Sequence, residues 1–146
     1  MNTVLHPGDV ALVERGDQLE TLLGSCIAML LTDPRQTVGV MCHVVNGLLD
    51  RPQDTRHGEP AFLAMQSLLR SRGMDIHQCQ AWLYGGGAPH VGVSNVQWAQ
   101  ARLARAGIRI LGSDVGGLAA RRVRWSVGEL PQVTVLSMDC ALQTEP

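Results

Sequence analysis

The chain has 146 residues, 45% of them apolar and 17% charged, and its basic and acidic side chains leave a formal charge of −1. This length predicts a single domain over residues 1–146, and the balanced charge gives no overall attraction to nucleic acid or to an anionic membrane, so neither is expected as a partner. All twelve basic residues are arginine, which excludes chemistry through a lysine Schiff base.

Neither a membrane span nor a secretory signal is visible. The longest apolar run, residues 26–31, is far shorter than the roughly 20 residues that cross a bilayer. Residues 1–10 lack a basic segment followed by an apolar one, so we expect a cytoplasmic protein without membrane insertion. Because no two of its cysteines lie two to four residues apart, they are expected to be free thiols and not zinc ligands. The four are Cys26, Cys42, Cys79 and Cys140.

Short apolar runs and two amphipathic segments predict the elements. Strands are expected, in chain order, at 10–13, 26–31, 38–45, 81–84, 108–111, 123–127 and 133–136. A helix is expected to begin at Pro60 and end at Gly73, and a second to begin with a capping box at 94–97 and end at Gly107. Several strands follow one another too closely for helical crossovers. This favours an α+β fold with a layered, β-rich core of mixed or antiparallel sheets and two main helices outside.

One cysteine and one histidine are candidates for chemistry. Cys26 directly follows a Gly24-Ser25 turn at the start of an apolar strand, where backbone N–H groups could hold an oxyanion. If the strands at 26–31 and 38–45 pair around Asp33-Pro34, Cys26 and His43 lie nearly opposite each other. That pair is what nucleophilic catalysis by cysteine needs. A histidine on an apolar strand is also commonly a core residue, so the residues alone leave both interpretations open.

An ordered set of short motifs along the chain bears on the function. The order of short motifs resembles the CheD family of chemoreceptor glutamine deamidases over roughly residues 8–136. The motifs are Leu23-Gly24-Ser25-Cys26, Asp33-Pro34 and His43, then Arg56-His57-Gly58-Glu59, Tyr84-Gly85-Gly86-Gly87-Ala88, Val91-Gly92 with Asn95, and Asp114-Val115-Gly116-Gly117 with Arg121. After His43 the chain departs from the family's usual apolar run ending in Leu-Pro, and it reads Val44-Val45-Asn46-Gly47. This departure lies where a substrate groove could form.

The resemblance implies a protein-glutamine deamidase that acts on the cytoplasmic helices of chemoreceptors. Cys26 would be the nucleophile that forms a thioester, and His43 its proton partner, with no metal or organic cofactor. Gly24 and Ser25 would contact the substrate. Some members also convert glutamate methyl esters, and some are regulated by a CheC-like phosphatase. The family is similar in fold to the deamidating toxins of the cytotoxic necrotizing type.

The resemblance leaves the third catalytic position open. Relatives carry a threonine shortly before the cysteine, which corresponds to Thr21 here, although the family position can also fall on Glu20. A carboxylate at Glu20 could orient an imidazolium, but near the sulfur it would raise the pKa of the thiol. Thr21 is the expected residue and Glu20 its rival.

Two other functions remain open from the sequence. The domain could be an adaptor that binds receptors or a CheC-like phosphatase with little turnover, or a cysteine hydrolase of small amides or esters. A deep closed pocket at Cys26 would favour the small-molecule hydrolase, and a shallow groove would favour a helical protein substrate. Of the basic residues near the C-terminus, Arg122 and Arg124 are expected on a solvated strand face. Asp114 is expected to bond its own backbone.

Overall fold

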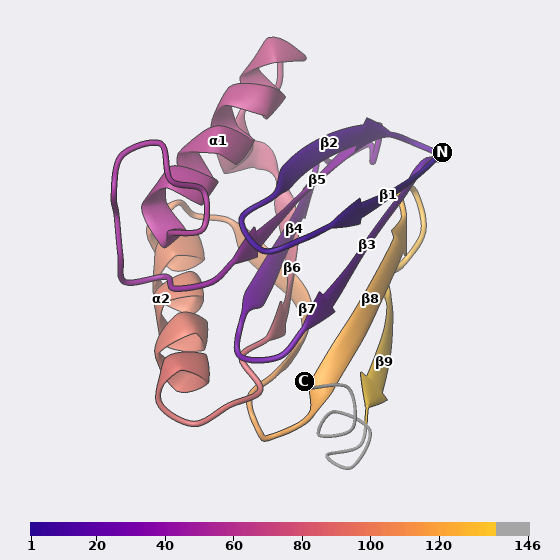
Figure 1. The fold of residues 1–146 in the computed structure, drawn as a ribbon. Helices are drawn as coiled ribbons and strands as arrows, with labels where there is room; N and C mark the ends of the chain where they lie inside the picture. The colour runs from indigo at the N-terminus through magenta and orange to yellow at the C-terminus, as the bar shows by residue number, and fades with distance from the viewer. Residues whose placement is uncertain (137–146) are drawn as a thin grey trace.

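Two β-sheets and two α-helices make up the described part of the chain. The computed structural model describes residues 1–136 (Figure 1). The strands are β1 Asn2–Leu5, β2 Val10–Glu14, β3 Gln18–Leu23, β4 Ile27–Thr32, β5 Val38–Val44, β6 Gln80–Gly85, β7 Arg109–Val115, β8 Ala120–Ser126 and β9 Gln132–Leu136. The helices are α1 Gly58–Ser71 and α2 Val91–Arg105, with a short 3₁₀ turn, η1, at Ile76–Gln78. Cys140 lies outside the described residues.

The larger sheet has the strand order β2-β5-β4-β6-β7 and carries both helices on one face. Its pairs are antiparallel except β6 with β7, so the sheet is mixed. Every residue of β4 and β5 is buried, because helices cover one face of these strands and the second sheet covers the other. That two-sided burial explains why both strands are almost continuously apolar in the sequence.

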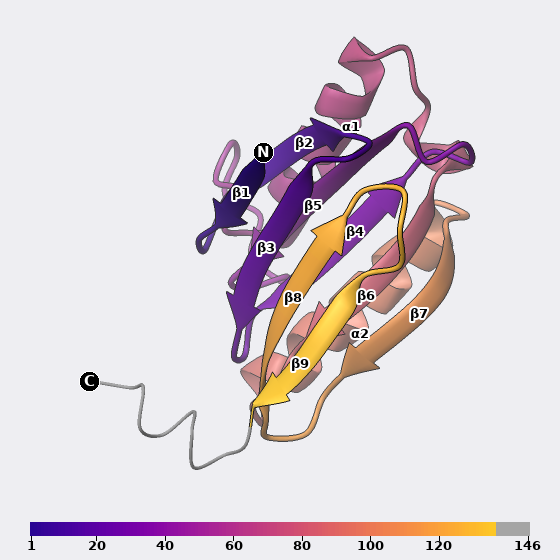
Figure 2. The ribbon, with the colours of Figure 1, turned by 90° about the vertical axis from the view of Figure 1, so that its right-hand side faces the viewer.

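The smaller sheet, β1-β3-β8-β9, lies against the face that the helices leave free (Figure 2). Its core with the larger sheet includes Trp82 and Trp125, whose ring centroids are 5.6 Å apart. The molecule is therefore layered: small sheet, large sheet, helices. The expected α+β class, with mixed sheets and outer helices, is confirmed. None of the helices within residues 1–136 is long and apolar enough to span a bilayer.

The structure corrects three expectations about elements. Strands β1 and β3 were not predicted; in β3 the polar residues Gln18, Glu20 and Thr21 interrupt the apolar ones, so no apolar run marks the strand. Helix α1 begins at Gly58, so Pro60 lies inside the first turn, where its missing N–H is harmless. Helix α2 begins at Val91, and the capping box expected at 94–97 does not form: the N-cap is His90, and the N–H of Ser94 donates to the His90 carbonyl.

Candidate active site

The loop that carries Cys26 crosses from the small sheet to the large one, between the end of β3 and the start of β4. Its carbonyl oxygens are all bonded. Gly24 and Cys26 accept from the N–H groups of Gly87 and Gly86, both at 2.8 Å, and Ser25 accepts from a side-chain amide at 3.0 Å. Among residues 1–136, no backbone carbonyl or side-chain oxygen accepts from the N–H groups of Ser25 and Cys26. Those two N–H groups remain available.

The glycine turn at 85–87 fits closely around this loop. Gly85 and Gly86 have φ of +110° and +69°, in the left-handed region that favours glycine. A Cβ at Gly85 would lie 2.2 Å from the Cys26 carbonyl oxygen, and one at Gly87 would lie 3.2 Å from that of Gly24. The segment is thus the tight turn that its sequence suggests, and its glycines allow the backbone to approach the cysteine loop.

His43 and Thr21 face each other between the two sheets. Both side chains are buried, and Thr21 Oγ1 lies 2.7 Å from His43 Nδ1. The same hydroxyl donates its only proton to the carbonyl oxygen of Leu5, at 2.9 Å. It must therefore accept from His43, so Nδ1 carries the proton and Nε2 keeps a free lone pair. The imidazole is held in the tautomer that a general base requires at Nε2.

Glu20, the rival third residue, lies on the opposite face of β3. Its carboxylate accepts from Arg124 Nε at 2.6 Å, on the outer surface of the small sheet. Because successive side chains of a strand point to opposite faces, Thr21 and Glu20 cannot both face His43. The structure brings Thr21 and not Glu20 to the imidazole.

Cys26 and His43 share a face of the larger sheet, but they are not directly opposite. His43 pairs with Ala28, two residues beyond Cys26, so the two side chains are diagonal neighbours. The hairpin register differs from the expected one because the strands pair about a centre between residues 35 and 36, and not between residues 34 and 35. The Asp33 carboxylate accepts from the N–H of Thr37 at 2.8 Å and of Val38 at 3.0 Å. The adjacent Cys42 points to the helix side, away from the face of His43, and is fully buried there.

Burial keeps both candidate groups neutral at neutral pH. Loss of hydration lowers the pKa of His43 to about 4, with Asp9 raising it and His6 lowering it further by smaller amounts. Burial also raises the pKa of the Cys26 thiol, although its own backbone N–H opposes this. The resting pair is therefore a thiol and an imidazole, and not a thiolate–imidazolium ion pair. Cys26, Cys42 and Cys79 are free, as expected.

We expect stability to fall between pH 6.5 and pH 4 because of His43. The ordinary pKa of histidine is 6.5, and the folded value is about 4. The unfolded chain therefore binds a proton in this range that the folded protein does not bind. The stabilisation is complete above pH 6.5, and about 2 to 3 kcal/mol of it is lost by pH 4.5. Urea unfolding of wild type and of His43→Gln at pH 6.5 and at pH 4.5 measures this loss of stability. An equal loss in both proteins contradicts the assignment.

A buried arginine, Arg121, also bonds the glycine turn at 85–87. Arg121 donates to the carbonyl oxygen of Gly85 at 3.2 Å and of Gly116 at 2.8 Å, and pairs with the Asp114 carboxylate at 3.1 Å. Asp114 therefore bonds Arg121, so the expectation of a bond to its own backbone was wrong. Arg122 and Arg124 are exposed, as expected.

Sequence reasoning assigned no site role to Arg121 or to Asn95, the amide donor to Ser25, although both fall inside the quoted motifs. The signal for Asn95 was a polar residue in the buried stripe of α2, between Gly92 and Ala99.

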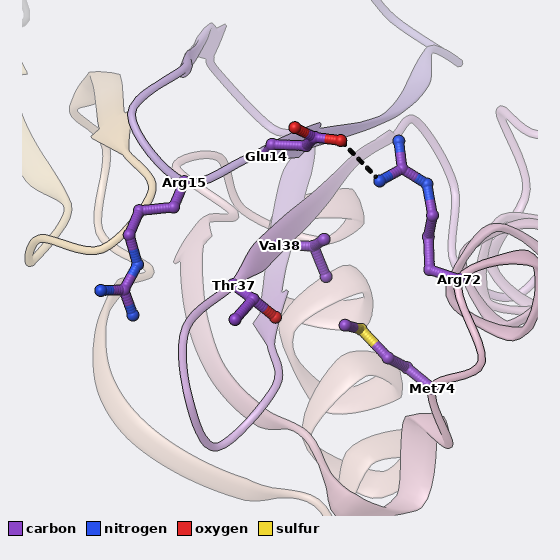
Figure 3. A pocket seen from close by; sticks show the side chains of 6 residues that line it. All are labelled: Glu14, Arg15, Thr37, Val38, Arg72 and Met74. Atoms are coloured by element: carbon purple, nitrogen blue, oxygen red, sulfur yellow. Dashed lines mark hydrogen bonds and ion pairs between the residues drawn. The ribbon is translucent and has the colours of Figure 1, made fainter.

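Several cavities lie away from Cys26. One of about 590 Å³ lies at the far end of β5, where Arg72 donates to Glu14 at 2.9 Å and the Arg15 side chain points away from that pair (Figure 3). Others of about 590, 490 and 340 Å³ are lined by residues of α1, the turn after α1, and the 45–57 loop. Neither Cys26 nor His43 lines any of these four. Within residues 1–136, no three potential metal-ligating side chains converge.

Comparison with known proteins gives a consistent result. The family model described as CheD chemotactic sensory transduction matches residues 49–134. The chain is 32% identical over 129 residues to the probable chemoreceptor glutamine deamidase CheD 2 of Geobacter sulfurreducens, covering 82% of this chain and 79% of the relative. It is 34% identical over 135 residues to the corresponding Caulobacter vibrioides protein, covering 86% and 72%. It is 29% identical over 138 residues to the chemoreceptor glutamine deamidase CheD of Thermotoga maritima, covering 87% of each chain.

Proposed function

The chain belongs to the CheD family of chemotactic sensory transduction proteins, and from this premise we propose that it is a chemoreceptor glutamine deamidase. It acts as one CheD-like domain over residues 1–146, in the cytoplasm and without a cofactor. Its substrates are glutamines on the cytoplasmic helices of receptors, which it converts to glutamate. The observation that carries the proposal is the Thr21–His43 hydrogen bond, which leaves Nε2 free on the face that Cys26 shares.

The first half of the reaction forms a thioester. The Cys26 sulfur attacks the carboxamide carbon while His43 Nε2 takes the thiol proton, so the S–C bond forms as the S–H bond breaks. The oxyanion accepts hydrogen bonds from the free N–H groups of Ser25 and Cys26. When the C–N bond breaks, His43 returns the proton to the nitrogen and ammonia leaves. Gly24 and Ser25 contact the substrate from the same loop.

The second half releases glutamate. Water attacks the thioester carbon while His43 Nε2 accepts one of its protons. The C–S bond then breaks, and the proton on His43 returns to the Cys26 sulfur. Thr21 keeps Nδ1 protonated throughout, so that one nitrogen serves both steps. The pKa of His43, lowered to about 4 by burial, makes its imidazolium a strong acid toward the departing ammonia.

The decisive experiment is mass spectrometry of receptor cytoplasmic fragments incubated with the protein. Each converted glutamine gains about 1 Da, because an amide becomes an acid, and one ammonia is released for each. Absence of any conversion across the chemotaxis receptors of the source organism contradicts the proposal. Glutamate methyl esters in the same fragments measure the esterase activity of the same site.

Replacing Thr21 with valine is expected to lower kcat by about 10- to 100-fold, because the imidazole loses the hydroxyl that sets its tautomer. Valine has nearly the same shape, so the fold should persist. The matched control is Glu20→Gln on the opposite face, which should leave kcat within about twofold. Deamidation rates of the two variants on one receptor fragment provide the comparison. A larger loss in Glu20→Gln than in Thr21→Val would assign the third role to Glu20.

An adaptor role on the same surface is the second candidate. Leu48 and Leu49 follow the segment that departs from the family pattern, and both are at least half exposed. Such side chains can dock a receptor helix or a CheC-like phosphatase without turnover. Binding that survives Cys26→Ala, with no glutamine converted by wild type, would support this function.

We propose further that this layered arrangement, with two sheets face to face and helices on one outer side, is similar to the catalytic fold of the deamidating toxins of the cytotoxic necrotizing type.

A further inference from the structure

One amide side chain joins the loop of Cys26 to the end of strand β5. Asn95 is fully buried, and its Nδ2 donates to the carbonyl oxygens of Ser25 and Val45, each at 3.0 Å. Its Oδ1 accepts from the N–H of Gly47 at 2.8 Å. Ser25 immediately precedes Cys26, and Val45 follows His43 by two residues. A single side chain thus bonds both segments that carry the reacting groups.

Helix α2 places this amide by an unusually close approach. A Cβ at Gly86 would lie 2.3 Å from Val96 Cγ2, and one at Gly92 would lie 2.6 Å from the Gly86 carbonyl oxygen. Only glycine at both positions lets the first turns of α2 rest on the glycine turn that bonds the Cys26 loop. The amide is therefore held by rigid backbone on the side of the helix as well as on the side of the sheet.

The bonds of Asn95 replace a sheet ladder that stops just short of the cysteine. The last paired residues of β4 and β5 at this end are Ile27 and Val44. Beyond them, the carbonyls of Ser25 and Val45 both accept hydrogen bonds from Nδ2 of Asn95. The end of β5 and the start of β4 are therefore joined through the single Nδ2 group of Asn95.

We propose that Asn95 is a positioning residue, which holds the Cys26 sulfur in reach of His43 by fixing the Ser25 and Val45 carbonyls relative to each other. The inference rests on the proposed function, since it assigns Asn95 a task in that reaction. Displacement of a reacting atom by about 1 Å can lower a rate about 10²-fold. The amide touches neither substrate nor reacting atoms, so its effect passes through Cys26.

The test compares Asn95→Asp with Thr32→Val at pH 8. The carboxylate of Asn95→Asp can still accept from Gly47, but it cannot donate to Ser25 or Val45. Thr32 is equally buried and bonds the Val38 carbonyl at 2.7 Å, at the opposite end of the β4–β5 pair. Both substitutions remove buried hydrogen bonds from the same hairpin, so both should lower thermal stability. If Asn95→Asp does not fold, Asn95→Ser removes the amide without burying a charge.

For the Asn95 variant we expect kcat to fall about 10- to 100-fold with KM changed less than about threefold, while Thr32→Val keeps kcat within about twofold. Alkylation of Cys26 by iodoacetamide, followed by peptide mass spectrometry, gives a readout that needs no substrate. In the variant, the rate at pH 7 relative to that at pH 10 should fall, because the thiol loses the help of the imidazole. If no receptor glutamine reacts, this ratio still tests the positioning role of Asn95 separately from the proposed deamidase function.

Two results overturn the inference. The first is an Asn95 variant that keeps kcat within about twofold of wild type, whatever happens to its melting temperature. The second is an Asn95 variant whose ratio of alkylation rates at pH 7 and pH 10 equals that of wild type. This result decides against the positioning role even if wild type converts no glutamine. A fall in that ratio, with Thr32→Val unchanged, supports the positioning role even then.

Discussion

Cys26→Ala is expected to reduce glutamine deamidation of receptor fragments by at least about 10⁴-fold, to the level of the fragment alone. Without sulfur no thioester can form, and neither His43 nor the free N–H groups of the loop can replace a nucleophile. The fold should survive, because the three carbonyls of the loop keep their bonds to Gly86, Gly87 and Asn95. Ammonia release and the gain of about 1 Da per converted glutamine measure the loss.

The matched control is Cys79→Ala. Cys79 is also a free cysteine, but it is buried where Cys26 is only partly buried, and it follows η1 and packs in the core on the helix side of the large sheet. Deleting its sulfur should lower stability by about 1 kcal/mol and leave turnover near the wild-type rate. If Cys26→Ala retains substantial activity, or if the two cysteine variants lose activity equally, Cys26 is not the nucleophile.

His43→Gln is expected to lower kcat/KM by about 10²- to 10⁴-fold, because the substitution removes Nε2, the proposed acceptor of the thiol proton. The pH profile should change as well. In the wild type, a proton on Nε2 blocks the base, and the pKa of His43 is about 4. The rate should therefore rise with pH through about 4 and be level by pH 6, well below the ordinary histidine range. The variant should lose this acid limb.

His77→Gln is the control for the histidine substitution. His77 is exposed in η1, away from Cys26, and its ring bonds the Ala106 carbonyl at 2.9 Å. Its replacement should leave both the rate and the acid limb unchanged. An acid limb near pH 6.5 in wild type, or one that persists in His43→Gln, would assign the base to another residue.

The strands that carry Cys26 and His43 were predictable because they are buried on both faces. Such strands are long apolar runs, and β4 and β5 were found within one residue of their ends. Strand β3 was missed because burial, and not polarity, alternates along it: the polar Thr21 is buried and the apolar Leu22 is exposed, so no apolar run marks the strand. Apolar runs therefore do not mark β3, the strand that supplies Thr21.

The hairpin register was predicted only in part. A turn centred between residues 34 and 35 places Cys26 opposite His43, whereas the observed pairing is centred between residues 35 and 36, so the partner of His43 is Ala28. The shift by two residues keeps Cys26 on the face of His43, because side chains alternate with a period of two. The shared face could therefore be predicted, but the direct pairing could not.

By itself, the sequence determined the family of the protein and the class of the fold, and it supplied the candidates for the site. A cysteine after a Gly-Ser turn, a histidine on the next strand and the ordered motifs needed no coordinates, since they depend on residue type and local spacing. Tertiary structure alone decided that Thr21 and not Glu20 meets the imidazole, that Asn95 bonds the cysteine loop, and that Arg121 bonds the glycine turn. These contacts join residues 22, 70 and 36 positions apart, and the packing of separate elements, not any local pattern, brings such distant side chains together.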